Sequence, residues 1–155
     1  YSARIVGHHV GQNMRAEDAR QALYQWVGLR KKENLAGCIH HTDGGSQYFS
    51  GLYLSELDRL DAQVSRAENC LMNGYAEQRN GLIKHHLLPT VQADSKRKLG
   101  QEISRIIRQY NEERKQEGLG WLSPAGFEKK IAGVSVKPER KLYNFNLNDD
   151  GFKEA

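Results

Sequence analysis

Residues 37–48 read Gly-Cys-Ile-His-His-Thr-Asp-Gly-Gly-Ser-Gln-Tyr, and this stretch decides the fold that we expect. Its first half is a short apolar run, which is typical of a buried strand. Its second half is a polar turn rich in glycine. Asp43 therefore stands directly after a strand, and open α/β sheets place their active sites at the carboxyl ends of their strands.

The residues around this stretch alternate between strand and helix patterns. Helices are predicted over residues 15–32, 49–60, 75–88, 95–114 and 124–131, and strands over residues 1–10, 37–41 and 62–65. Residues 66–74 have no clear period and are predicted as a loop. Strands alternating with helices, followed by helices alone, indicate an α/β layer with a helical extension.

The composition indicates one globular domain. The chain has 155 residues, of which 38% are hydrophobic and 27% charged, and only two are cysteine. A chain of this length can bury a core, and no apolar run approaches the roughly 20 residues of a membrane helix. Two cysteines exclude a disulfide scaffold and favour a reducing compartment. We therefore expect a cytoplasmic protein with no membrane partner.

Positive charge is concentrated in the second half of the chain. Residues 1–76 carry 8 basic and 8 acidic side chains, whereas residues 77–141 carry 14 basic and 8 acidic ones. This excess favours a polyanionic partner. The basic side chains that stand close together in this part are Lys96, Arg97, Lys98, Arg105, Arg108, Arg114 and Lys115. They form either a phosphate-binding face or a solvated helix face, since glutamates interleave with them.

Two carboxylates are the candidate chemical centre. Asp43 follows a strand, and Glu77 lies near the start of a predicted helix after a long polar loop. A helix beside the sheet can bring the two carboxylates together, and Mg²⁺ or Mn²⁺ prefers such ligands. Two such ions about 3.5–4 Å apart activate an attacking oxygen and stabilise a leaving one. The other interpretation is a turn aspartate and a solvated helix glutamate.

Four blocks of sequence resemble the retroviral-integrase-like transposases of bacterial insertion sequences. Residues 41–48 resemble the motif of their second catalytic aspartate, and residues 73–84 resemble their glutamate helix. Residues 1–7 resemble the strand that follows their first aspartate, and residues 110–114 with 119–128 resemble their C-terminal signature. The blocks stand in family order.

The resemblance implies a ribonuclease H-like fold, a D-D-E catalytic triad and a polynucleotidyl transferase with two divalent metal ions, Mg²⁺ or Mn²⁺. Asp43 is similar to the second triad aspartate and Glu77 to the glutamate, so both are expected as catalytic residues and metal ligands. Asn80 and Lys84 match helix positions that touch substrate DNA in the family, and Asn73 matches a mobile catalytic-loop position. We expect all three to contact DNA.

The chain departs from the family pattern in two places. The family's first aspartate lies upstream of residues 1–7, so we expect a fragment with an incomplete sheet at its N-terminus that is inactive alone. The 33 residues between Asp43 and Glu77 are slightly fewer than the family usually has. We expect a partial integrase-like catalytic core over residues 1–92, a helical extension over 93–133 and a polar tail over 134–155.

Two other patterns predict no additional chemistry. The histidine pairs at 8–9, 40–41 and 85–86 do not predict zinc, because adjacent residues of a strand or helix point in different directions. Trp121 is expected in the core rather than as a side chain that stacks on a nucleic-acid base.

The sequence therefore predicts DNA transposition, with metal-dependent phosphodiester cleavage and strand transfer. The expected partners are element ends and target DNA, bound by a homo-oligomer associated with the nucleoid. One alternative is a catalytically inactive DNA-binding or assembly remnant, which the missing first aspartate favours. Another is a ribonuclease H-like nuclease that cuts without joining.

Overall fold

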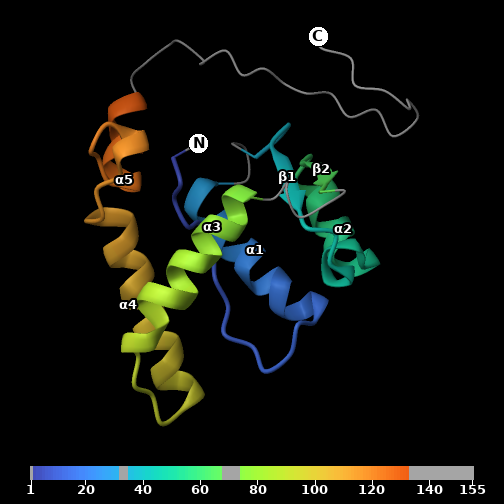
Figure 1. Cartoon of the computed structure of the whole chain (residues 1–155). Coiled ribbons are helices and arrows are strands. Elements are labelled where there is room, and N and C mark those ends of the chain that lie inside the picture. The colour runs from blue at the N-terminus through green and yellow to red at the C-terminus, as the bar shows by residue number, and fades with distance from the viewer. Residues whose placement is uncertain (1, 32–34, 68–73, 133–155) are drawn as a thin grey trace.

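The computed structural model describes residues 2–31, 35–67 and 74–132 (Figure 1). Its main elements are α1 (Ala16–Arg30), β1 (Ile39–Thr42), α2 (Gly51–Arg59), β2 (Gln63–Arg66), α3 (Gly74–Leu82), α4 (Lys96–Glu112) and α5 (Pro124–Ile131). The shorter segments are the 3-10 turns η2 (Ser46–Phe49), η5 (Leu88–Thr90) and η6 (Glu117–Leu119) and the π turn η4 (Ile83–Leu87). The expected order of an α/β part followed by helices is confirmed. The expected tail over residues 134–155 lies outside the described residues.

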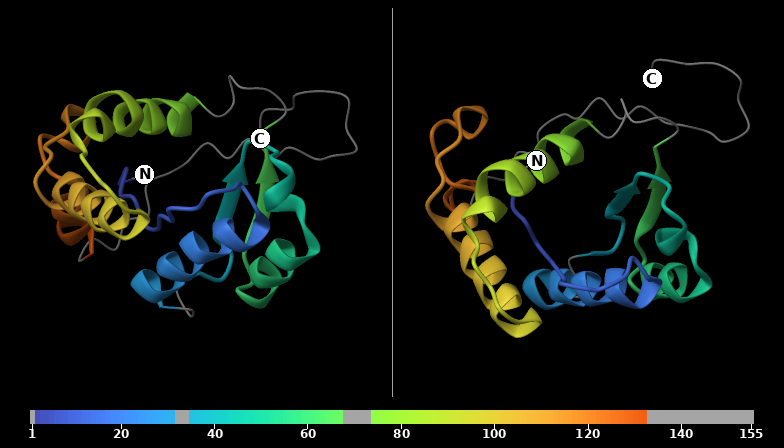
Figure 2. Two further views of the ribbon diagram at one scale, coloured as in Figure 1. Left: turned by 90° about the horizontal axis from the view of Figure 1, so that it is seen from below. Right: turned by 60° about the horizontal axis from the view of Figure 1, so that its bottom comes forward.

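β1 and β2 form a parallel two-stranded sheet. Ile39 pairs with Gln63 and Thr42 pairs with Arg66, so both strands end at one edge, which we call the carboxyl edge. Parallel neighbours need a crossover connection, and α2 supplies it. In the right-hand view of Figure 2, α1 and α2 lie side by side beneath the strands.

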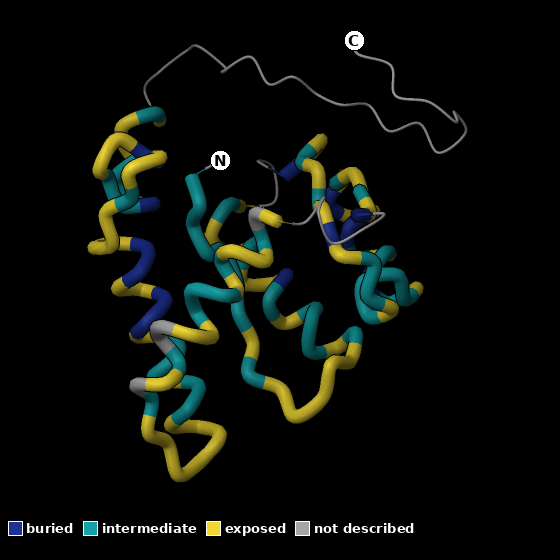
Figure 3. The backbone as a smooth tube through the Cα atoms, in the orientation of Figure 1, coloured by how far each residue is buried: buried dark blue, intermediate teal, exposed yellow. Residues whose placement is uncertain are grey.

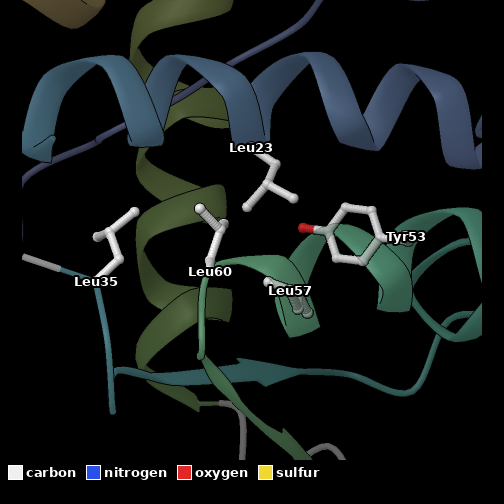
Figure 4. Packing of buried hydrophobic residues seen from close by; sticks show 5 residues of the cluster. All are labelled: Leu23, Leu35, Tyr53, Leu57 and Leu60. Carbon is white, nitrogen blue, oxygen red and sulfur yellow. The ribbon is translucent and has the colours of Figure 1, made fainter. Parts of the chain in front are cut away.

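The main core lies between α1, α2 and the chain that enters β1 (Figure 4). Leu57 of α2 is 0% exposed, and Leu35, which precedes β1, is 1% exposed. Leu23 of α1 packs in the same cluster. Tyr53 and Leu60 complete it: Tyr53 and Leu57 share one face of α2, as their helical spacing predicts, and Leu60 is the residue that follows the helix.

A second region of packing joins α4 and α5, and Figure 3 shows buried stretches of the tube along α4. Ile106, Ile107 and Tyr110 are buried on one face of α4, as their helical spacing predicts. The hydroxyl of Tyr110 donates a hydrogen bond to the carbonyl of Ala3 at 3.0 Å. α4 therefore packs against the N-terminal segment, residues 2–10.

The strand predicted over residues 1–10 is wrong for the described part of this segment. Residues 2–10 are not paired with a strand of the described chain. Side chains bind their backbone instead. The Asn111 amide accepts from the N–H of Ile5 and donates to its carbonyl, both at 2.9 Å, and Gln25 accepts from the N–H of His8 at 3.1 Å. Alternating residues favour an extended chain, but a strand also needs a partner backbone.

Serine residues begin three of the helices. The side chains of Ser50, Ser95 and Ser123 each accept a hydrogen bond from the backbone N–H three residues later. Such caps satisfy N–H groups that have no partner within the helix. Pro124 follows Ser123 at the first helical position, where its missing N–H costs nothing. The predicted helix start at residues 123–124 is therefore confirmed.

Two elements differ from the prediction. The helix predicted over residues 75–88 keeps α geometry only to Leu82 and continues through η4 and η5, the latter containing Pro89. Trp121 was expected in the core but is 67% exposed. Gly120 and Trp121 both have a positive φ, 62° and 61°, and this left-handed turn separates η6 from α5.

No helix in the described ranges has the length and apolar character needed to cross a membrane.

Glu128 of α5 links three segments of the chain. Its carboxylate accepts hydrogen bonds from Arg4 at 2.6 Å, from Ser2 at 2.7 Å and from Arg30 of α1. Its side chain is only 14% exposed. Burial raises the pKa of Glu128, but the hydrogen bonds from Arg30, Arg4 and Ser2 outweigh this and lower it from 4.5 to about 2.

Glu128→Gln is expected to lower the free energy of unfolding at neutral pH by about 2 kcal/mol, since a hydrogen bond to a charged group contributes about 1.5–3 kcal/mol. The pKa of Glu128 is lower in the folded state than in the unfolded state. Its stabilisation is therefore complete above a pH of about 4.5 and is lost as the pH falls toward 2. Urea unfolding at several pH values measures this difference.

The exposed Glu113 is the matched control, and Glu113→Gln should change stability little at any pH. A difference between wild type and Glu128→Gln that stays constant between about pH 5 and pH 3 would contradict the assigned ion-pair network.

Candidate active site at the carboxyl edge

Asp43 directly follows β1, as the sequence predicted, and its side chain is exposed. Its Oδ1 accepts a hydrogen bond from the backbone N–H of Gly45 at 3.0 Å. This bond within the turn orients the carboxylate. Among the described residues, Oδ2 has no hydrogen-bond partner. Within the described ranges, one carboxylate oxygen therefore remains accessible at the carboxyl edge.

Gly44 allows the turn to pass close to β2. Its φ is +81°, and a Cβ at this position would lie 2.7 Å from Nε of Arg66. The positive φ favours glycine, and a Cβ here would require the Arg66 side chain to move. The backbone N–H of Gly44 also donates to the hydroxyl of the buried Thr42 at 3.3 Å. The turn that carries Asp43 is thus held by its own backbone and by the end of β1.

Arg66 is a candidate functional residue that the sequence analysis missed. It is the last residue of β2 and pairs in register with Thr42. Its guanidinium lies 5.4 Å from the centre of the Phe49 ring, a cation–π arrangement that holds a positive charge beside the Asp43 turn. The sequence analysis assigned Arg66 to a loop. Had the two predicted strands been paired in parallel, Arg66 would have been expected at the carboxyl edge, beside the end of β1.

His40 connects the carboxyl edge to the core. Its ring centre lies 6.0 Å from that of Trp26, 6.5 Å from that of Tyr48 and 5.6 Å from that of Tyr53. A hydrogen bond of 3.1 Å joins its Nε2 to the Tyr53 hydroxyl. Burial and the neighbouring His41 lower the pKa of His40, and burial with Tyr48 raises that of Tyr53 to about 12. Both side chains are neutral at pH 7, and their role is to support β1.

Glu77 lies in the first turn of α3 and is exposed. Asn80, three positions later in α3, is exposed too, and this spacing places it on the same helix face as Glu77. Lys84 is also exposed but lies in the π turn η4, after the α geometry ends at Leu82. Figures 1 and 2 show that the start of α3 is the end of this helix nearer to the sheet. Asn73 lies outside the described residues. The structure thus places Glu77 on the part of α3 that approaches the sheet.

The two carboxylates fit part of a divalent-cation site. Asp43 and Glu77 both present exposed oxygen ligands, the type that Mg²⁺ and Mn²⁺ prefer. Within the described ranges, no group of three or more His, Cys, Asp or Glu residues is placed to hold a metal ion. Asp43 and Glu77 are therefore candidate ligands only, and the described ranges contain no complete ligand set.

Comparison with known proteins identifies the class of this fold. Residues 59–124 match the Integrase core domain family. A chain of the simian T-cell lymphotropic virus intasome, solved in complex with PP2A regulatory subunit B56 gamma, superposes with a TM-score of 0.66. The match covers 88% of this chain and 48% of that chain at 13% identity, so the two share a fold. Residues 59–124 thus carry integrase core sequence, and the chain shares its fold with a chain of that intasome structure.

Curated relatives define the family more narrowly. The transposase for insertion sequence element IS904 of Lactococcus lactis is 34% identical over 132 residues, which cover 83% of this chain and 51% of the relative. The insertion element IS600 uncharacterized 31 kDa protein of Shigella sonnei is 33% identical over 137 residues, covering 84% and 48%. The chain belongs to the integrase-like insertion-sequence transposases. It spans about half the length of these relatives.

Proposed function

We propose that this chain is the catalytic-core part of a transposase that cuts DNA at element ends and joins those ends to target DNA. The placement of Asp43 carries the proposal, since it is exposed directly after β1, at the edge where α/β sheets hold active sites. The fold proposed for the complete domain is ribonuclease H-like. Residues 1–92 would form a partial catalytic core and residues 93–133 a helical extension that supports it.

Asp43 and Glu77 are the proposed metal ligands. Bound Mg²⁺ or Mn²⁺ would supply activation of an attacking oxygen and stabilisation of a leaving oxygen at phosphorus. Asp43 contributes a carboxylate that the N–H of Gly45 orients through one oxygen. Glu77 stands in the first turn of α3, where the helix dipole favours a negative charge. The local structure thus supports a carboxylate function at both positions.

Four side chains around these carboxylates are proposed to bind DNA. Asn80 of α3 and Lys84 of η4 follow Glu77 and are exposed, and Asn73 precedes α3 in the sequence. Lysine binds phosphate by charge and asparagine by its amide, contacts that position a nucleic acid without reading its sequence. Arg66 is the fourth, because its guanidinium lies beside the Asp43 turn. The acting species is proposed to be a homo-oligomer on DNA at the nucleoid.

A joining assay tests this function. The full-length protein that carries this chain is incubated with labelled duplexes from both sides of its coding region and a supercoiled target plasmid. The incubation contains either millimolar Mg²⁺ or EDTA. Joined product is expected with Mg²⁺ only, because phosphodiester chemistry on a metal site needs the cation.

Two other results would each overturn the proposal. Cleavage without joined product would indicate a ribonuclease H-like nuclease. DNA binding that falls steeply with salt, ignores Mg²⁺ and leads to no product would indicate a non-catalytic remnant.

A further inference from the structure

A surface hollow of about 830 Å³ lies between the N-terminal segment, α1 and α4. Neither Asp43 nor Glu77 lines it. Its lining includes the basic residues Lys96, Arg97 and Arg108, the histidines His8 and His9, and the hydroxyl of Ser104. None of the described residues that line it is acidic. The hollow is therefore a concentration of positive charge.

The basic side chains of α4 fall into two groups. Lys98 pairs with Asp94 at 2.5 Å and Arg105 pairs with Glu102 at 3.0 Å, and neither basic residue lines the hollow. Lys96, Arg97 and Arg108 line it, and in the described part of the chain they form no ion pair. The paired group fits a solvated helix face. The group in the hollow has charge available for a ligand.

The opposite wall of the hollow is held in place by hydrogen bonds. Nε2 of His8 lies 2.9 Å from the hydroxyl of Ser104, and the N–H of His8 donates to Gln25 of α1 at 3.1 Å. Nε2 of His9 lies 3.0 Å from Oδ1 of Asp18, so this nearby carboxylate already has a partner. A Cβ added at Gly100, on the floor, would meet no atom within 4 Å. The hollow is thus a formed, open surface.

We propose that this hollow binds the phosphodiester backbone of DNA at a place separate from the carboxyl edge. Arg97 and Arg108 are 11 positions apart on α4, or about 16 Å along a helix that rises 1.5 Å per residue. A row of that length matches several successive phosphates and exceeds the size of a single phosphate ion. Guanidinium groups bind phosphate through paired hydrogen bonds. The inference rests on the proposed function only in taking DNA as the polyanion.

Binding of a fluorescent DNA duplex, measured by anisotropy in EDTA over a range of salt concentrations, tests the site. The double variant Arg97→Gln and Arg108→Gln is expected to bind about tenfold more weakly for each cation removed. The slope of log affinity against log salt should fall by about 0.9 for each lost phosphate contact. Gln101→Glu, which adds an acidic side chain to the lining, should weaken binding as well.

The double variant Lys98→Gln and Arg105→Gln is the matched control, since it removes the same charge from the same helix outside the hollow. Its affinity and salt slope should stay near the wild-type values. Equal losses in both double variants would indicate a general effect of net charge and overturn the site. An unchanged affinity in the Arg97 and Arg108 variant would overturn it too.

Competition with inorganic phosphate at constant ionic strength tests whether the hollow binds an extended DNA backbone rather than a single phosphate ion. Wild-type binding should resist millimolar phosphate, and displacement by phosphate would indicate a site for one small anion instead. Unfolding midpoints of all variants should match that of the wild type, because the substituted side chains are exposed. This assay contains no metal and no chemical step, so its failure is distinct from failure of the joining assay.

Discussion

Glu77→Gln is expected to reduce strand transfer by the full-length protein at least about 10³-fold while leaving its affinity for DNA unchanged. The substitution keeps the size of the side chain and removes the charged oxygen that is proposed to bind metal. A catalytic cation contributes several kcal/mol to transition-state stabilisation, and about 4 kcal/mol corresponds to a factor of 10³ in rate. Single-turnover joining rates and anisotropy with the same duplex measure the two quantities.

Asp43→Asn should cause a loss of the same order, since both carboxylates serve one proposed site and their effects are not additive. Asp58→Asn and Glu113→Gln are the matched controls, because Asp58 of α2 and Glu113, which follows α4, are exposed and lie outside the site. Their joining rates should stay close to the wild-type rate. If Glu77→Gln joins DNA at the wild-type rate, the assignment of this site is wrong.

Leu57→Ala is expected to lower the free energy of unfolding by about 3–5 kcal/mol. Leu57 is 0% exposed at the centre of the cluster between α1 and α2, so truncation removes buried surface and leaves a cavity. Leucine-to-alanine changes in well-packed cores cost about 2–5 kcal/mol, and more where the surroundings cannot relax. Urea unfolding followed by circular dichroism measures the change. The expected loss is a large fraction of the stability of a small domain.

Leu29→Ala is the matched control on the surface of the same packing unit. Leu29 lies in α1 but is 41% exposed, so its truncation should change the free energy of unfolding by less than about 0.5 kcal/mol. Similar effects of the two substitutions would contradict the placement of Leu57 in the core.

The helices were predictable because their signals are local. Ser95 and Ser123 cap α4 and α5 within one turn, and the apolar stripe of Ile106, Ile107 and Tyr110 has helical spacing. The position of Asp43 was predictable for the same reason, since a strand and a glycine-rich turn are adjacent in sequence. Glu77 could be placed at the start of a helix. How it lies relative to Asp43 depends on the intervening chain and is still a prediction.

The hollow shows where local signals end. The sequence displayed seven clustered basic residues on and after one helix and left two interpretations open. Ion pairing distinguishes the two interpretations of this cluster. Lys98 and Arg105 have carboxylate partners, whereas Arg97 and Arg108 line the same hollow as His8. His8 is some 90 residues away in sequence, so no spacing rule could connect it with α4.

The sequence by itself determined that an α/β part is followed by helices, that Asp43 stands directly after a strand, and the family of the chain. These follow from interactions between residues a few positions apart, or from motifs read in order. The tertiary structure alone decided that residues 2–10 bind side chains rather than a strand, that Trp121 is exposed and that Arg66 stands beside Asp43. Each of these depends on which distant backbone or side chain becomes a neighbour on folding, and local propensity contains no information about that choice.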